Sequence, residues 1–181
     1  MSGHSRWSKV KHIKAIEDVR KGKIFSKMAR MITVAAREKG GNPETNPKLR
    51  LAIEQAKELN VPKENIERAI KRGLGQLEGT RIEEATYEAY GPGGVAMIIE
   101  TITDNKNRTL AEIKHILSEH QAKLAQAGSV KYLFEQKNSD WTPKYPISVD
   151  QKTKEQLFKL FEALDEQEDV QEIYSNLEEN I

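Results

Sequence analysis

Four basic residues of one predicted helix have a spacing that suits phosphate binding. They stand at offsets of 0, 4, 7 and 14, which places them on one side of an α-helix: Lys23, Lys27, Arg30 and Arg37. The sequence between Lys21 and Arg37 contains no acidic residue, whereas an ordinary solvated helix face usually mixes both signs of charge. We therefore predict that this row of cations binds a phosphate backbone, in preference to the alternative of a plain solvated face.

The residues before this helix form a predicted basic arm. The segment 2–11 has little apolar periodicity, which suits a chain that becomes ordered on binding. The arm and the start of the helical region add five candidate nucleic-acid contacts: Arg6, Trp7, Lys9, Lys11 and Lys14. Trp7 has two interpretations, stacking on a base or packing the arm against the helical domain, and packing is the commoner role of a tryptophan near a terminus.

Charge divides the chain into two parts of opposite sign. Residues 1–78 hold 18 Lys and Arg against 9 Asp and Glu, and residues 79–181 hold 11 against 19. Because clustered cations repel one another unless an anionic surface neutralises them, the first part is predicted to bind nucleic acid. We expect a basic helical nucleic-acid-binding domain with its arm over residues 1–78 and an acidic α+β domain over residues 79–181.

The sequence contains no recognisable motif for catalysis or metal binding. It has no cysteine, its four histidines lack the spacing of ligand pairs, and the glycine-rich segment 73–79 lacks the Lys-Ser/Thr pair of a nucleotide-binding loop. The longest apolar run, 95–99, is far shorter than a membrane-spanning helix requires. We therefore expect a non-enzymatic cytoplasmic protein with no cofactor, no metal site, no small-molecule substrate and no membrane contact.

Helices are predicted for the basic part of the chain. A short helix over 13–21 is expected to end at Gly22, and a longer one then runs to Lys39 with apolar residues at three- and four-residue spacing. Two further helices are predicted to start at Asn46, as a side-chain cap, and at Pro62, as the first helical residue. These helices should pack into a small domain that holds the cationic row.

Strands and helices are predicted for the acidic part in the order ββαβαβ, which suits an antiparallel sheet with two helices on one face. The predicted strands cover 85–90, 95–103, 130–134 and 170–174, and the helices run through 110–117 and 152–164. The expected fold class is therefore α+β. The loops 91–94 and 104–109 are interpreted as a hairpin turn and a helix cap by Asn105 or Asn107, and the alternative is a functional surface that they form together.

Several stretches, in order along most of the chain, are similar to the YebC family, which includes a mitochondrial translational activator. They are 3–7 (Gly-His-Ser-Arg-Trp), 11–12, 22–25, 42–47 (Asn-Pro-Glu-Thr-Asn-Pro), 65–73, 87–94 (Tyr-Glu-Ala-Tyr-Gly-Pro-Gly-Gly), 103–109 (Thr-Asp-Asn-Lys-Asn-Arg-Thr) and 128–130 (Gly-Ser-Val). The resemblance implies a helical N-terminal domain followed by α/β domains. It also implies a non-enzymatic role in gene expression.

Two roles compete within this family: DNA-binding transcriptional regulation, and action at the ribosome that relieves stalling on proline-rich stretches. We favour a ribosome-associated translation factor that contacts rRNA or tRNA, because a basic arm and a cationic row suit irregular RNA and no helix-turn-helix is evident. A DNA-binding transcriptional regulator is the first alternative. A protein-interaction adaptor that works through the acidic domain is the second.

The chain departs from the usual family pattern in one place. Most members carry a further α/β domain between the segments that correspond to 130–134 and to the residues after 146. Here only a short proline-containing segment joins these two parts. The resemblance therefore implies a shortened member with two domains.

Overall fold

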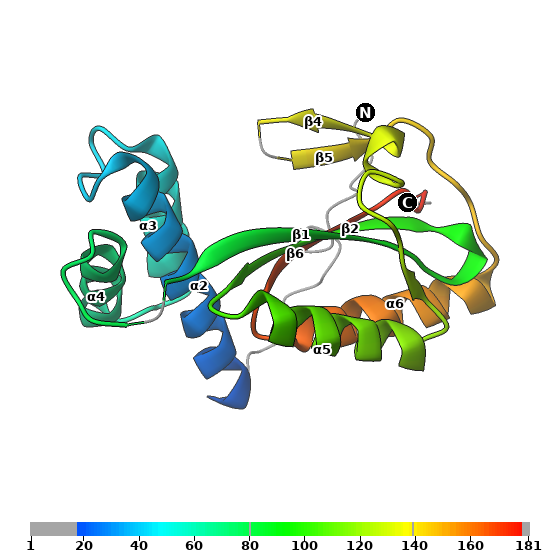
Figure 1. Cartoon of the computed structure of the whole chain (residues 1–181), viewed down its shortest axis with the longest axis horizontal. Helices are drawn as coiled ribbons and strands as arrows, with labels where there is room; N and C mark the ends of the chain where they lie inside the picture. The colour runs from blue at the N-terminus through cyan, green and yellow to red at the C-terminus, as the bar shows by residue number, and fades with distance from the viewer. Residues whose placement is uncertain (1–17, 80, 139, 179–181) are drawn as a thin grey trace. The chain divides into compact units, whose positions relative to one another are not determined.

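The computed structural model describes residues 18–79, 81–138 and 140–178 (Figure 1). These residues form two compact units. The helical unit contains the described residues up to Glu84 together with Ile102–Asn105, and the sheet unit contains Ala85–Thr101 and the described residues from Lys106 onward. Within this part of the chain, every helix is too short or too polar to span a membrane.

Three described helices make up the helical unit: α2 (Asp18–Lys39), α3 (Pro47–Glu58) and α4 (Lys63–Gly73). Helix α2 runs through Gly22 without a break, so the predicted interruption at this glycine is wrong. A glycine inside a helix costs only about 1 kcal/mol, which the packing of the rest of α2 outweighs. The predicted short helix over 13–21 begins outside the described residues.

Helix α2 packs against both shorter helices, and α4 approaches it most closely. At Gly73, an added Cβ would stand 2.4 Å from the carbonyl oxygen of Thr33 and 2.8 Å from the Cβ of Ala36. The buried Thr33 hydroxyl lies 3.1 Å from the carbonyl oxygen of Ala69, which joins the two helices by a hydrogen bond. The end of α4 is therefore a glycine because a side chain there would push the helices apart.

Asn46 caps α3 as predicted and also ties it to the end of α2. Its side chain accepts a hydrogen bond from the Leu49 N–H at 3.1 Å, and Pro47 is the first helical residue. Its amide group donates to the carbonyl oxygens of Ala35 and Gly40, both at 2.8 Å. Pro62, by contrast, precedes α4, whose first residue is Lys63.

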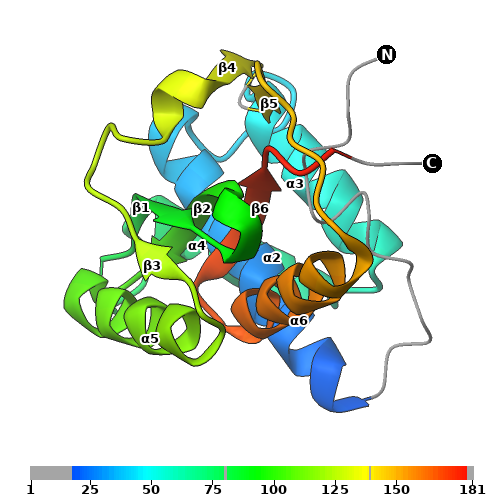
Figure 2. The same ribbon diagram turned by 90° about the vertical axis from the view of Figure 1, so that its right-hand side faces the viewer.

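A four-stranded sheet in the order β3-β1-β2-β6 is the centre of the sheet unit. Its strands are β1 (Glu83–Tyr90), β2 (Ala96–Thr103), β3 (Lys123–Leu124) and β6 (Val170–Ser175). The pairs β1–β3 and β2–β6 are antiparallel. Helices α5 (Lys106–Glu119) and α6 (Gln151–Glu166) lie side by side on one face of this sheet (Figures 1 and 2). The predicted α+β fold class, with two helices on one face of an antiparallel sheet, is confirmed.

The other face of the sheet is covered by a hairpin of β4 (Phe134–Lys137) and β5 (Asp140–Pro143) (Figure 1). Phe134 is buried against Tyr174 of β6, and the half-buried Trp141 packs on the same cluster. The Trp141 indole N–H donates to a carboxylate oxygen of Glu100 at 2.8 Å. The short proline-containing segment that follows Phe134 therefore takes part in a two-stranded sheet, which forms a third layer.

The predicted strand over 130–134 is wrong except for its last residue. Val130 has helical backbone angles, and the 3₁₀ helix η2 (Lys131–Leu133) follows it. The cause is Glu88 on β1, whose carboxylate accepts hydrogen bonds from the backbone N–H groups of Gly128, Val130 and Lys131 at 2.6, 2.7 and 2.9 Å. Three N–H groups can converge on one carboxylate only where the backbone turns, so this segment is not extended. The third strand of the sheet is β3 instead.

The two loops singled out in the sequence lie at opposite ends of β2. The 3₁₀ helix η1 (Pro92–Gly94) precedes β2, and the 104–109 segment follows it. An eight-residue strand separates them, so the alternative of one functional surface formed by both loops is wrong. Asn105 immediately precedes α5, whereas Asn107 lies inside its first turn.

Candidate nucleic-acid interface

Helix α2 carries the described members of the predicted cationic row. Lys23, Lys27 and Arg30 are half-buried, and Arg37 is exposed. A half-buried Lys or Arg lays its aliphatic stem along the protein and keeps its charge near water. The charged groups of these three half-buried side chains therefore lie near the surface of α2. The other candidates lie outside the described residues: Arg6, Trp7, Lys9, Lys11 and Lys14.

A buried valine interrupts this row. Val34 lies on the same side of α2, four residues after Arg30 and three before Arg37. It is 1% exposed and packs with Ile82 and Ile102 of the same unit. The signal was present in the sequence, as one apolar residue at a helical position between two arginines. The structure thus separates Arg37 from the first three cations of the row.

Arg37 also has a structural contact. Its guanidinium donates a hydrogen bond to the carbonyl oxygen of Ile82, which fastens the chain after α4 to α2. Because a guanidinium has five N–H donors, this contact leaves donors for an external phosphate.

The close approach of α4 to α2 brings Arg37 next to the basic residues of α4, a proximity that the sequence alone does not show. The position of a Cβ on Gly73 would lie 3.2 Å from the backbone nitrogen of Arg37, so the last turn of α4 is next to this arginine. We call the exposed basic residues at this junction the α2–α4 cluster: Arg37, Arg68, Lys71 and Arg72. Lys71 and Arg72, in the last turn of α4, also interact favourably with the C-terminal end of the helix dipole.

Two cations elsewhere in the helical unit are paired with carboxylates, whereas those of the α2–α4 cluster are not. Lys48 lies 3.0 Å from Glu38 and 3.4 Å from Glu84, and Lys63 lies 3.6 Å from Glu67. Within residues 18–79, 81–138 and 140–178, no salt bridge joins any member of the cluster to an acidic side chain. The positive charge of the cluster is therefore available to an external anion.

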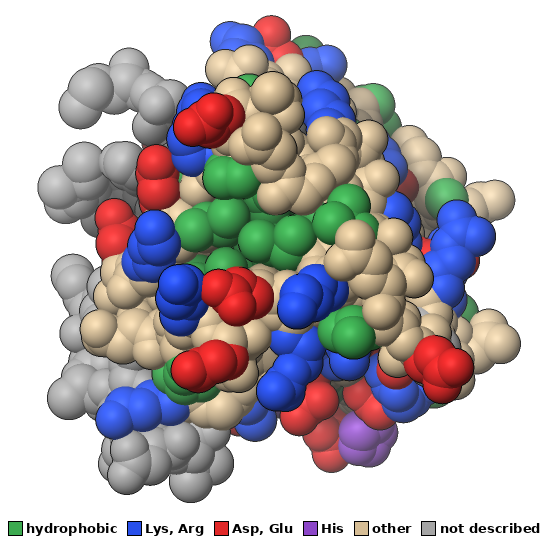
Figure 3. Space-filling view, turned by 90° about the vertical axis from the view of Figure 1, so that its left-hand side faces the viewer, with side chains coloured by type: hydrophobic (Ala, Val, Ile, Leu, Met, Phe, Trp, Pro, Cys, Tyr) green, Lys and Arg blue, Asp and Glu red, His purple; other side chains and the backbone are tan. Residues whose placement is uncertain are grey.

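Apolar side chains accompany these cations on the surface. In the space-filling view of Figure 3, Lys and Arg side chains, interspersed with Asp and Glu side chains, surround a central group of hydrophobic side chains. Leu51, Leu74 and Leu77 are the exposed large hydrophobic residues of the helical unit among those described, at 56%, 41% and 39%. A surface of this kind offers ionic contacts to phosphates together with apolar contacts to sugars and bases.

Glu88 is a buried carboxylate with a structural use. It is 4% exposed. Burial by itself raises the pKa of Glu88, but the three backbone N–H groups of the 128–131 turn, together with the charge of Lys131, outweigh burial and lower the pKa below its ordinary value. The stretches 87–94 and 128–130, both similar to the YebC family, are therefore linked in the structure, because Glu88 of the first accepts hydrogen bonds from the backbone N–H groups of the second.

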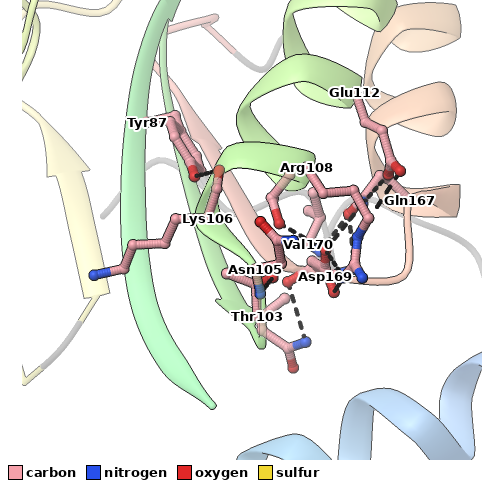
Figure 4. Close-up of polar contacts among 11 residues, drawn as sticks. Tyr87, Thr103, Asn105, Lys106, Arg108, Glu112, Gln167, Asp169 and Val170 are labelled. Carbon is pink, nitrogen blue, oxygen red and sulfur yellow. Dashed lines mark hydrogen bonds and ion pairs between the residues drawn. The ribbon is translucent and has the colours of Figure 1, made fainter. Parts of the chain in front are cut away.

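A second buried carboxylate, Asp169, explains the family-like stretch 103–109 (Figure 4). Asp169 is 1% exposed and accepts hydrogen bonds from Arg108 at 3.1 Å and from the Thr109 hydroxyl at 2.7 Å. Gln167 holds the other side, because its amide oxygen accepts the N–H of Asp169 at 2.7 Å and its amide group donates to Glu112 at 2.7 Å. These residues join α5 to the turn before β6, so this stretch supports the fold.

The comparisons with known proteins agree with the resemblance seen in the sequence. Residues 5–76 match a family model described as the TACO1/YebC protein N-terminal domain, and residues 82–139 and 136–177 match the model of the TACO1/YebC second and third domain. The two matched parts of the second model meet at the β4–β5 hairpin.

Related proteins cover most of the chain. A relative named probable transcriptional regulatory protein, from Dictyoglomus thermophilum, is 56% identical over 147 residues, which are 81% of this chain and 59% of that protein. One of the same name from Desulfosudis oleivorans is 39% identical over 236 residues, covering 97% and 96% of the two chains. That alignment is longer than this chain of 181 residues, so the relative has a stretch without a counterpart here.

A solved structure has the same fold. It is the crystal structure of a conserved hypothetical protein from Aquifex aeolicus, with a TM-score of 0.86 and 37% sequence identity. The match covers 97% of this chain and 98% of that one. The chain spans little more than half of the length of several curated relatives, with 56% of the protein from Dictyoglomus turgidum as an example.

Proposed function

Since the chain belongs to the TACO1/YebC family, we propose that it is a non-enzymatic, nucleic-acid-binding regulator of gene expression that acts on translation. The observation that carries the proposal is the α2–α4 cluster, whose exposed cations have no carboxylate partner among the described residues. Such a cluster displaces counterions from a phosphate backbone, which supplies affinity that does not depend on sequence. The half-buried cations Lys23, Lys27 and Arg30, on the other side of the buried Val34, add a second group of candidate contacts on α2.

RNA is the proposed target in preference to duplex DNA. In a helix-turn-helix protein, residues in the N-terminal part of the second helix contact base edges in the major groove. Here α3 and α4 are joined by a short turn, but both pack mainly on α2, and the N-terminal half of α4 exposes Glu64 and Glu67. Carboxylates at that position repel the phosphates on either side of a groove. The basic C-terminal end of α4 suits an irregular RNA backbone better.

The proposed site of action is the ribosome, where the protein helps translation through difficult, proline-rich stretches. This part of the proposal rests on the resemblance to the family, and its physical requirement is a surface that binds rRNA or tRNA phosphates. The α2–α4 cluster and the row on α2 meet this requirement without a catalytic group.

DNA-binding transcriptional regulation is the second candidate function. The name carried by the relatives, probable transcriptional regulatory protein, favours it. Its physical basis is the same set of cations, since phosphate contacts position a protein on DNA as well as on RNA. A footprint on duplex DNA with a strong sequence preference would favour this candidate over the first.

Translation of purified messages tests the proposal directly, because transcription plays no part in it. Two messages that differ only in a proline-rich stretch are translated in a reconstituted system with and without the protein. We expect the protein to raise the yield of the proline-rich message selectively, and the Arg68→Glu, Lys71→Glu, Arg72→Glu variant to lose this effect. The matched control is Lys48→Glu, Lys57→Glu, Lys63→Glu, which makes the same change of charge away from the cluster. An equal yield of both messages with and without the native protein would refute the translation role.

A further inference from the structure

Two tyrosines of the sheet unit, Tyr132 and Tyr145, have strongly exposed side chains. Tyr132 is 63% exposed and Tyr145 is 64% exposed, more than any other large hydrophobic side chain among the described residues. Neither phenol group has a hydrogen-bond partner in the described part of the chain. Large aromatic rings left in water are a cost unless a partner covers them, so these two residues point to a binding surface.

The β4–β5 hairpin brings these tyrosines together although they are thirteen residues apart. In its register, Phe134 lies opposite Pro143. The Lys144 N–H then donates to the carbonyl oxygen of Leu133 at 2.8 Å, which continues the pairing by one residue on each side. Tyr132, in η2, and Tyr145, after β5, are the next residues beyond this bonded pair, so the backbones of both lie at the base of the hairpin.

The backbone of each tyrosine is held in place from the core of the unit. The Glu88 carboxylate binds the N–H groups of Val130 and Lys131, directly before Tyr132. The buried Asn176 side chain donates to the carbonyl oxygen of Tyr145 at 3.3 Å. Two rings on a fixed backbone lose little conformational freedom on binding, which favours affinity.

The charge beside these rings is positive, although the acidic part of the chain is negative as a whole. The ammonium group of Lys131 lies 5.6 Å from the centre of the Trp141 ring. Lys144 is bonded through its backbone to Leu133 and directly precedes Tyr145. No salt bridge joins Lys131 or Lys144 to a carboxylate among the described residues, whereas Lys137 at the other end of the hairpin is paired with Glu135 at 3.2 Å. The lysines without a salt bridge are thus on the side of the tyrosines, and the charge of Lys131 also acts on Glu88.

We propose that Tyr132 and Tyr145, with Lys131 and Lys144, form a second RNA-binding surface that takes unpaired nucleotides of a single strand. The rings stack on bases, and the two ammonium groups neutralise the adjoining phosphates. Stacking on aromatic side chains is tolerant of sequence because every base has a π-face. This inference rests on the proposed function, and it adds a partner chemistry and a site in the sheet unit that the cations of the helical unit do not supply.

A protein partner fits this surface less well. The centres of protein–protein interfaces are depleted in lysine, and here lysines stand immediately beside both tyrosines. Exposed rings flanked by unpaired cations are the composition of surfaces that bind single-stranded nucleic acid. The choice between the two partners is part of the test.

The test measures binding of a fluorescent, unstructured oligouridine RNA of about twelve nucleotides, a length that one small single-strand site accommodates. The full chain is compared with variants in which both tyrosines are changed together to Ala, to Leu or to Phe. We expect the dissociation constant to rise about tenfold or more for the Ala pair and for the Leu pair, and to stay within roughly twofold for the Phe pair, because only Phe keeps the ring. Circular dichroism and unfolding curves of the same variants establish that each is folded.

Three outcomes would overturn the tyrosine surface or distinguish its failure from the failure of the proposed function. If the Leu pair binds oligouridine as the native chain does, the rings do not stack and the inference is wrong. If the Ala pair is also unchanged while the Arg68→Glu, Lys71→Glu, Arg72→Glu variant loses binding to ribosomal RNA, the second surface is wrong and the proposed function stands. If the tyrosine variants lose binding and the cluster variant does not, the tyrosine surface stands and the cluster fails as the principal interface.

Discussion

Replacing Glu88 with Gln is expected to destabilise the sheet unit strongly, although the side chain keeps its shape. The carboxylate accepts three backbone N–H groups at 2.6 to 2.9 Å and is 4% exposed. An amide offers one oxygen and places its NH₂ group at the other position, so at least one N–H donor loses its acceptor. That donor is Gly128 if the amide oxygen takes the place of Oε2, and Val130 together with Lys131 if it takes the place of Oε1. A buried donor without a partner costs about 1–3 kcal/mol, and a lost bond to a charged acceptor contributes a similar amount. We therefore expect the free energy of unfolding to fall by about 3 kcal/mol at pH 7.

The same contacts make this stabilisation depend on pH. The folded-state pKa of Glu88 is lowered, and the unfolded carboxyl titrates near about 4.3. Because the unfolded state binds the proton more readily, the stabilisation is fully present above the unfolded pKa and is lost as the pH falls through the folded pKa. The difference between the native chain and Glu88→Gln should be constant from pH 7 to about 5 and shrink below about 4.

Urea unfolding followed by the fluorescence of Trp141 measures this difference. Trp7→Phe is used as the background, because the sequence has two tryptophans and Trp141 then reports alone on the hairpin layer. Glu135→Gln serves as the control, since this exposed acid is paired only with Lys137 at the surface and should change stability by less than about 0.5 kcal/mol. Equal stability of the native chain and Glu88→Gln at pH 7, or a difference that does not shrink in acid, would refute the role assigned to this carboxylate.

Three further perturbations test the helical unit. Gly73→Ala should destabilise it by about 1–3 kcal/mol in thermal or urea unfolding, because the new methyl group meets backbone of α2. Gly22→Ala should instead stabilise it by about 0.5–1 kcal/mol, since nothing lies within 4 Å of the added Cβ, and the reverse order of the two variants would contradict the packing described. Asn46→Ala should cost about 2 kcal/mol, because it removes a helix cap, one bond to α2 and one to Gly40 directly after it, and a cost below about 0.5 kcal/mol would show that the amide contacts contribute nothing. Reversing three charges of the α2–α4 cluster should flatten the log–log dependence of duplex binding on salt by about two to three, and an unchanged slope would remove the cluster from the interface.

Regular elements of this fold could be predicted because their information is local. Asn46 followed by Pro47 marks the start of α3, and the apolar spacing of α5 and α6 is that of helices lying on a sheet. The break expected at Gly22 failed because one unfavourable residue does not end a helix whose other residues pack well. Local preference was outweighed there by tertiary contacts.

Elements that depend on distant residues could not be predicted. The apolar character of 130–134 favoured a strand, and the acid that turns this segment stands more than forty residues earlier, at Glu88.

The candidate site likewise has one part that the sequence predicts and parts that it does not. The row on α2 follows from helical spacing, whereas the α2–α4 cluster exists only because Gly73 lets α4 lie against Arg37. The placement of Tyr132 and Tyr145 at the base of one hairpin likewise depends on a strand pairing that periodicity did not reveal.

Co-sedimentation with purified ribosomes measures whether the protein binds the ribosome through the α2–α4 cluster. The native chain, the Arg68→Glu, Lys71→Glu, Arg72→Glu variant and the Lys48→Glu, Lys57→Glu, Lys63→Glu control are compared at physiological salt with an excess of competitor duplex DNA. We expect the native chain and the control to sediment with ribosomes and the cluster variant to remain in the supernatant. Retention of the cluster variant, or loss of the native chain to the DNA competitor, would contradict it.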